Sequence, residues 1–129
     1  MTAGYVIDIE KEAERNEFFR KVLCTADKSQ LVVMSLGPGE EIGLEVHDGD
    51  QILCIVEGAG VAVVGGVEHK IDEGRLVFVP AGVNHNVVNG KKEAMKLFTI
   101  YAPPQHRAGT VHRTKMEAEA SEHQEAWRK

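Results

Sequence analysis

Short apolar runs recur along most of the chain and are separated by turns in which glycine stands beside a polar residue. Runs of this length, rich in β-branched residues and bounded by residues that tolerate positive φ, are typical of antiparallel strands. No helical pattern separates them, which indicates an all-β barrel or sandwich. The expected strands are Phe18–Thr25, Gln30–Leu36, Ile42–His47, Gln51–Glu57, Gly60–Val64, Glu68–Ile71, Leu76–Val79, Asn84–Val88 and Met95–Tyr101.

The pattern changes near the end of the chain, where apolar residues recur at helical spacing. Thr114 and Glu117 have the spacing of a capping box, which satisfies backbone donors at a helix start. We therefore expect a helix over Lys115–Trp127 that packs on the barrel or on a partner chain. Its mostly apolar face would carry Met116, Ala120, His123 and Trp127. The alternating charges of residues 8–16 favour a second, short helix.

The chain divides by pattern into three parts: an N-terminal strand and short helix packing on the barrel (1–29), the barrel (30–102), and a Pro-rich connection with the C-terminal helix (103–129). The run Gln51–Val56 is apolar on both faces, whereas a strand of an isolated barrel normally leaves one face to water. We expect a second subunit to cover the other face, which predicts a homodimer. Coverage by the N-terminal segment or the C-terminal helix is the alternative.

Length and charge narrow the class of protein. A chain of 129 residues corresponds to one domain. The net charge of -5, with no basic stripe, argues against nucleic acid as a partner. No apolar run approaches the roughly 20 residues of a membrane helix, and the acidic start does not resemble a signal peptide. Cys24 and Cys54 lie in apolar runs and are expected to be reduced thiols, which predicts a cytoplasmic protein.

Candidate chemistry gathers around two turns. Glu45 and His47 stand two residues apart in an expected strand, so their side chains would share a face. Gln51 opens the next expected strand, and the turn after Pro80 leads the chain to His85. Nitrogen and oxygen donors of this mix suit a divalent metal, and two histidines with one carboxylate form the facial set of non-haem iron sites.

The segments around these residues resemble the two motifs of the cupins. They read PGEEIGLEVHDGDQILCIVEGAG at residues 38–60 and GRLVFVPAGVNHNVVN at residues 74–89. The resemblance implies a double-stranded β-helix, or jelly-roll, barrel that binds one divalent metal ion such as Zn, Fe, Mn or Ni. In cupins the first motif supplies His-x-His followed by a Glu, and the second motif supplies another His. The matching metal-ligand positions here are Glu45, His47, Gln51 and His85.

Two of those positions depart from the family pattern. Glu45 replaces a histidine and Gln51 replaces the glutamate, so the ligand set still carries one negative charge. Gln51 would bind the metal through its amide oxygen or hold a metal-bound water. Met34, Phe78, Phe98 and Tyr101 lie on expected strands and would shape a substrate pocket wherever strand parity turns them inward. His106 and His112 follow the barrel and are further candidates to reach back over its mouth.

Cupins span many activities, so the fold alone does not assign one. The resemblance implies a metal-dependent enzyme, isomerase-like or dioxygenase-like, acting on a small polar molecule. One alternative is a non-catalytic module that binds or senses a small ligand through the same metal. Another is metal-free acid–base chemistry, with His47 or His85 as the base and Glu45 orienting it.

Overall fold

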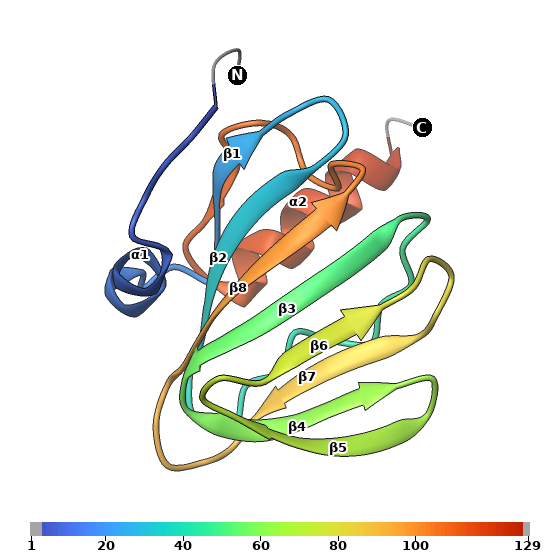
Figure 1. The fold of residues 1–129 in the computed structure, drawn as a ribbon. Coiled ribbons are helices and arrows are strands. Elements are labelled where there is room, and N and C mark those ends of the chain that lie inside the picture. Colours follow the sequence, from blue (N-terminus) through green and yellow to red (C-terminus); the bar gives the residue numbers. More distant parts are fainter. Residues whose placement is uncertain (1–3, 128–129) are drawn as a thin grey trace.

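Two antiparallel β-sheets enclose the core (Figure 1). The computed structural model describes the backbone of residues 4–127 and the side chains of residues 4–121. The sheet orders are β6-β3-β8-β2-β1-β9 and β5-β4-β7, so strands distant in sequence are neighbours, as in a jelly roll. The elements are α1 (Ile9–Arg15), β1 (Arg20–Thr25), β2 (Gln30–Leu36), β3 (Asp50–Glu57), β4 (Ala59–Val64), β5 (Val67–Asp72), β6 (Leu76–Val79), β7 (His85–Asn89), β8 (Met95–Ala102), β9 (Val111–His112) and α2 (Lys115–Trp127). The all-β prediction with a C-terminal helix is confirmed.

One expected strand is wrong. The segment from Ile42 to His47 forms no regular strand, although an isolated bridge joins Glu45 to His85 and the N–H of Ile42 donates to the carbonyl of Val87 at 2.9 Å. Gly43 has a φ of 111°, which no extended strand accommodates. Its N–H donates to the side-chain oxygen of Asn86 on β7 at 2.9 Å rather than to a backbone carbonyl of that strand. The short strand β9 was not expected from the sequence.

Inward-facing side chains change character from one end of the large sheet to the other. At one end Gln30, Tyr101 and Gln51 lie side by side in register on β2, β8 and β3. Towards the other end Met34 and Leu97 are paired in the same way, and both are fully buried. The apolar end supplies the hydrophobic core, whereas the polar end brings hydrogen-bonding groups out of water, where each needs a partner.

Helix α1 lies against the outer face of the large sheet, at the left of Figure 1. It begins after Asp8, whose carboxylate accepts a hydrogen bond from the N–H of Lys11 at 3.2 Å. The helix packs on β2, β3 and β8 and buries Ala13 completely. The N-terminal segment therefore covers part of the second apolar face, which was one of the two expectations for that face. Leu76 and Phe78 on β6 remain exposed.

Helix α2 begins as its sequence predicts but presents a different face. The Thr114 hydroxyl accepts a hydrogen bond from the N–H of Glu117 at 3.1 Å. Ala118 is buried in the core with Phe19, whereas Met116 is 79% exposed and Ala120 is also exposed. The predicted apolar face is therefore wrong for these residues, because the helix packs on the core through Ala118, which lies on a different face. The side chains of His123 and Trp127 lie outside the described residues.

Cys24 and Cys54 are both half-buried and form no disulfide, in keeping with the reduced thiols expected from the sequence. Burial raises the pKa of the Cys54 thiol, because an apolar environment disfavours the thiolate. Within residues 4–127, neither helix is long and apolar enough to cross a membrane.

Candidate metal centre

The segment before β3 is fastened to the start of β7 by backbone hydrogen bonds. The N–H of Glu45 donates to the carbonyl of His85 at 2.9 Å, and the N–H of His85 donates to the carbonyl of Glu45 at 3.0 Å. Residues opposed in this way project their side chains to the same face. The N–H of Gly82 donates to the carbonyl of His47 at 2.9 Å and anchors the far end of the segment. Glu45 and His85 thus reach one place without a regular strand.

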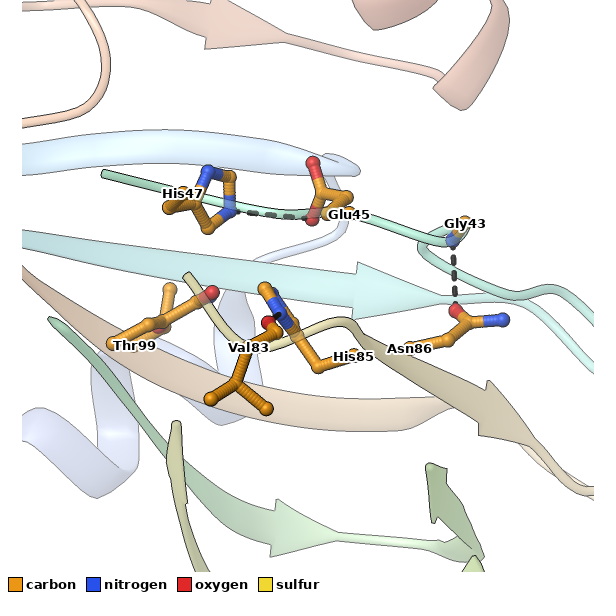
Figure 2. Close-up of polar contacts among 8 residues, drawn as sticks. Gly43, Glu45, His47, Val83, His85, Asn86 and Thr99 are labelled. Carbon is orange, nitrogen blue, oxygen red and sulfur yellow. Dashed lines mark hydrogen bonds and ion pairs between the residues drawn. The ribbon is translucent and has the colours of Figure 1, made fainter. Parts of the chain in front are cut away.

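Three of the predicted metal ligands converge at this point. One ligand atom each from Glu45, His47 and His85 lies within 4.8 Å of the other two. The Nε2 atom of His47 is 3.7 Å from Oε1 of Glu45, and the two imidazole rings are 5.1 Å apart between centroids. Figure 2 shows Glu45 and His47 on one segment facing His85 on the other. Both histidines are buried, with exposed fractions of 8% for His47 and 4% for His85.

The orientation of His85 is fixed by a backbone carbonyl. Its Nδ1 atom lies 3.0 Å from the carbonyl oxygen of Val83 (Figure 2). A carbonyl can only accept, so Nδ1 carries a proton, and in the neutral imidazole Nε2 therefore keeps its lone pair. A metal-ligating histidine is typically held in this tautomer by such a contact. No side-chain signal in the sequence could have identified Val83, because the contact comes from its main chain.

Gln51 occupies the polar end of the interior beside Tyr101. It is 1% exposed, and its Nε2 group donates to the hydroxyl of Thr99 at 3.1 Å. Its Oε1 atom is buried and has no hydrogen-bond partner among the described residues. The ring of Tyr101, paired with Gln51 across β3 and β8, stands edge-on to His47 at 5.6 Å between centroids. Thr99, which the sequence did not single out, positions the amide.

The unsatisfied atoms of this region suit a cation. Buried side-chain atoms of the candidate ligands that have no hydrogen-bond partner among the described residues are Oε1 of Glu45, Nε2 of His47, Oε1 of Gln51 and Nε2 of His85. Each such atom costs about 1–3 kcal/mol when nothing replaces its contact with water. Metal bonds to nitrogen and oxygen are about 2.1 Å long, so two atoms bound to one ion lie no more than about 4.2 Å apart. The Glu45–His47 pair at 3.7 Å already meets that limit, and any pair near the 4.8 Å bound of the cluster must move closer. The donor set fits a divalent metal.

Of the four residues expected to shape a substrate pocket, two lie in the interior and two lie on the outer face of the sheet. Tyr101 is buried beside His47. Met34 lies in the apolar part of the interior. Phe78 and Phe98 stand on the outer face, because they alternate with the inward-facing residues of β6 and β8. The structure therefore brings only Tyr101, of these four, to the cluster.

His106 extends the polar region beyond Tyr101. The two rings are 5.2 Å apart between centroids, and Nε2 of His106 is buried without a partner among the described residues. Burial, and then the nearby charges of Arg20, His112 and His47, lower the pKa of His106 to about 3. The imidazole is therefore neutral near pH 7. Of the two downstream histidines, His112 instead contacts Arg20, with Nδ1 3.1 Å from Nη1.

A small cavity borders Glu45 on the side of α2. Its volume is about 160 Å³, and its walls come from β1, from the segment before β3 and from the first turns of α2. Small-molecule pockets in proteins have volumes of roughly 300–1,000 Å³, so this cavity matches only a small ligand. Besides Glu45 it is lined by Phe19, Arg20, Ile42, Gly43, Leu44, Lys115, Ala118 and Glu119.

Comparison with known proteins agrees with this fold. The cupin domain family model matches residues 32–101. An uncharacterized Bacillus subtilis protein, YrkC, is 42% identical over 92% of this chain and 67% of its own length. A crystal structure of a Bacillus halodurans protein superposes with a TM-score of 0.90 at 41% identity, covering 92% of this chain and 96% of that one. A dimethylsulfoniopropionate lyase of Ruegeria pomeroyi, DddW, is 28% identical over 46% of this chain and 40% of its own length.

Proposed function

Because this chain belongs to the cupin domain family, we propose that it is a metal-dependent enzyme acting on a small polar molecule. The observation that carries the proposal is the set of buried candidate ligand atoms that have no hydrogen-bond partner among the described residues. Atoms of Glu45, His47 and His85 lie within 4.8 Å of one another and would hold one divalent ion, with Gln51 as a fourth, neutral donor. Zn, Fe, Mn and Ni all accept such ligands.

A bound divalent metal supplies Lewis acidity, which polarises a substrate oxygen or lowers the pKa of a bound water. The protein's part is to hold and orient the reacting groups. The carbonyl of Val83 keeps His85 in the ligating tautomer, and Thr99 holds the amide of Gln51. The 160 Å³ cavity beside Glu45 restricts the substrate to a small molecule. Isomerase-like and dioxygenase-like chemistry both suit such a site, and the lyase named among the relatives supports an enzymatic role.

The metal assignment is tested by elemental analysis of protein purified without added metal. We expect the wild-type chain to carry one divalent ion and the His47→Ala and His85→Ala variants to carry less than a tenth of that amount. His69→Ala is the matched control, because His69 is exposed on β5 and should leave the metal content unchanged. Equal metal content in all four proteins would refute the site.

The catalytic assignment needs a separate measurement. Turnover of small hydroxy acids, keto acids and sugars is assayed before and after chelation and after metal is restored. Loss with chelator and recovery with metal supports the enzyme. If one of these compounds instead raises the melting temperature of the metal-loaded protein without being converted, the chain is a binding or sensing module. Turnover that survives complete metal removal would point to acid–base work by His47 or His85.

A further inference from the structure

The cavity beside Glu45 is walled in part by segments of the chain that lie outside the cupin domain match. That match covers residues 32–101. The lining residues that fall outside it come from β1 and the residue before it and from the first turns of α2, and they are Phe19, Arg20, Lys115, Ala118 and Glu119. The barrel shared by the family therefore does not by itself set the chemistry of this cavity. The ligand that the cavity accepts depends on the two flanking segments.

Arg20 is the most deeply buried charged residue of the wall. It is 1% exposed, and its cross-strand partner is the buried Met34, so both side chains face the interior. Its Nη1 atom lies 3.1 Å from Nδ1 of His112, and its guanidinium carbon lies 5.3 Å from the centre of the Phe19 ring. These contacts orient the guanidinium. An arginine stays charged and presents a planar fork of donors, which matches the two oxygens of a carboxylate.

The other charged side chains of the wall differ in how strongly water screens them. The side chain of Lys115 is 25% exposed, and its Nζ atom lies 4.0 Å from Oε1 of Glu119, whose side chain is 65% exposed. Water therefore screens Glu119 more strongly than Lys115. Glu45 is one of the proposed metal ligands, so the ion would offset its charge. The buried part of the wall thus favours an anion, whereas the exposed carboxylate disfavours a doubly charged one.

We propose that the substrate is a small monocarboxylate whose carboxylate group binds to Arg20, with Lys115 as the second cation of the site. This inference rests on the proposed function, because it names the class of molecule that the same metal centre receives. The cavity volume of about 160 Å³ suits a carboxylate with a short carbon skeleton. Arg20 and Lys115 are then specificity-determining residues, because they select the charge of the molecule that lies beside Glu45.

Isothermal titration calorimetry on the metal-loaded full chain tests the charge of the ligand. Glycolate is compared with glycolamide, which has nearly the same shape and carries no charge. We expect glycolate to bind at least about tenfold more tightly, because hydrogen bonds to a charged group are the stronger ones. Inorganic phosphate should bind more weakly than glycolate. Equal affinity for glycolate and glycolamide, or tighter binding of phosphate, overturns the proposal.

Variants of the wall separate its contribution from that of the metal, which also attracts anions. Arg20→Gln should raise the glycolate dissociation constant at least about tenfold. Lys115→Gln should raise it about threefold, and it tests the same wall if circular dichroism shows that Arg20→Gln does not fold. Lys92→Gln is the matched control, because Lys92 is exposed between β7 and β8 and does not line the cavity. Wild-type affinity in Lys115→Gln, or in a folded Arg20→Gln, overturns the proposal.

Elemental analysis of the same samples distinguishes a failure of this inference from a failure of the proposed function. We expect the wild type and both cavity variants to carry the same amount of metal, so that any loss of glycolate affinity belongs to the cavity wall. A wild type without metal overturns both proposals. A metal-loaded wild type whose Arg20 and Lys115 variants keep full glycolate affinity overturns only the carboxylate assignment.

Discussion

Two buried glutamines flank Tyr101 at the polar end of the interior, and they differ in how far their hydrogen bonds are satisfied. Gln30 is 2% exposed, and its Oε1 atom accepts from the N–H groups of Gln105 and His106 at 3.2 and 3.0 Å. Its Nε2 group donates to the carbonyl of His106 at 2.7 Å and to the hydroxyl of Thr25 at 2.9 Å. Both ends of this amide are therefore in use.

Gln51 is equally buried, yet only its Nε2 group has a partner among the described residues. The same residue type therefore has two different roles. Gln30 ties the chain after β8 to β2 and contributes to stability, whereas Gln51 keeps an oxygen without a hydrogen-bond partner next to Tyr101, whose ring contacts His47. The difference teaches that burial alone does not mark a functional side chain. A buried donor or acceptor left unsatisfied is the more informative observation.

The largest contrast should come from Gln30→Glu compared with Gln51→Glu. A carboxylate at position 30 cannot donate, so it would face the carbonyl of His106 oxygen to oxygen. We expect Gln30→Glu to lower the free energy of unfolding by about 3 kcal/mol in urea denaturation at pH 7, with metal content unchanged. Gln51→Glu should retain the stability of the metal-loaded protein and bind metal more tightly. Equal destabilisation by both changes would erase the distinction between the two glutamines.

Metal affinity should depend more strongly on the charged ligand Glu45 than on the neutral Gln51. Glu45→Gln removes the only negative charge among the proposed ligands, whereas Gln51→Ala removes a neutral donor. We expect about a hundredfold loss of affinity for Glu45→Gln and about a tenfold loss for Gln51→Ala in titrations against a metal buffer. A larger loss for Gln51→Ala would reverse the proposed ranking, and Gln30→Ala, as the control at the other glutamine, should leave affinity unaltered.

The segment held by Gln30 should show its own pH dependence. The pKa of His106 is about 3 in the folded chain and near 6.5 when unfolded, so between these values only the unfolded state takes up the proton. The stability that the neutral imidazole contributes is complete above pH 6.5 and is lost as pH falls towards 3, by up to about 1.4 kcal/mol per pH unit. Denaturation curves of His106→Asn should lack this component, whereas those of His69→Asn should keep it.

The smallest effect is expected at Gln51 when metal is absent. Gln51→Leu gives up one hydrogen bond to Thr99 but also removes a buried oxygen that has no partner among the described residues. In chelator-treated protein we therefore expect the free energy of unfolding to change by less than about 1 kcal/mol, measured by urea denaturation. A loss as large as that of Gln30→Glu would mean that Gln51 is structural.

Sequence patterns located most strands because a half-buried strand repeats every two residues and its turns need glycine. They failed at Ile42–His47, where Gly43 adopts a positive φ and the segment joins β7 through isolated bridges. Apolar periodicity also misjudged α2, which packs through Ala118 rather than Met116. The expected pocket residues also ended on different faces of the sheet. The alternation along a strand says which side chains share a face, but it does not say which face turns inward.

The sequence by itself determined the cupin motifs, the all-β architecture and the chemical identity of the donors, because these depend on residue type and local spacing. Tertiary structure decided which candidate metal ligands lie close together and which buried side chains have hydrogen-bond partners. The hydrogen bond between Gln51 and Thr99 joins residues 48 positions apart, and the one between Gln30 and His106 joins residues 76 positions apart. Neither contact therefore follows from local sequence pattern. The tautomer of His85 likewise depends on how the carbonyl of Val83 is turned by the fold. Hydrogen-bond satisfaction is a property of three-dimensional neighbours, and only the folded chain fixes those.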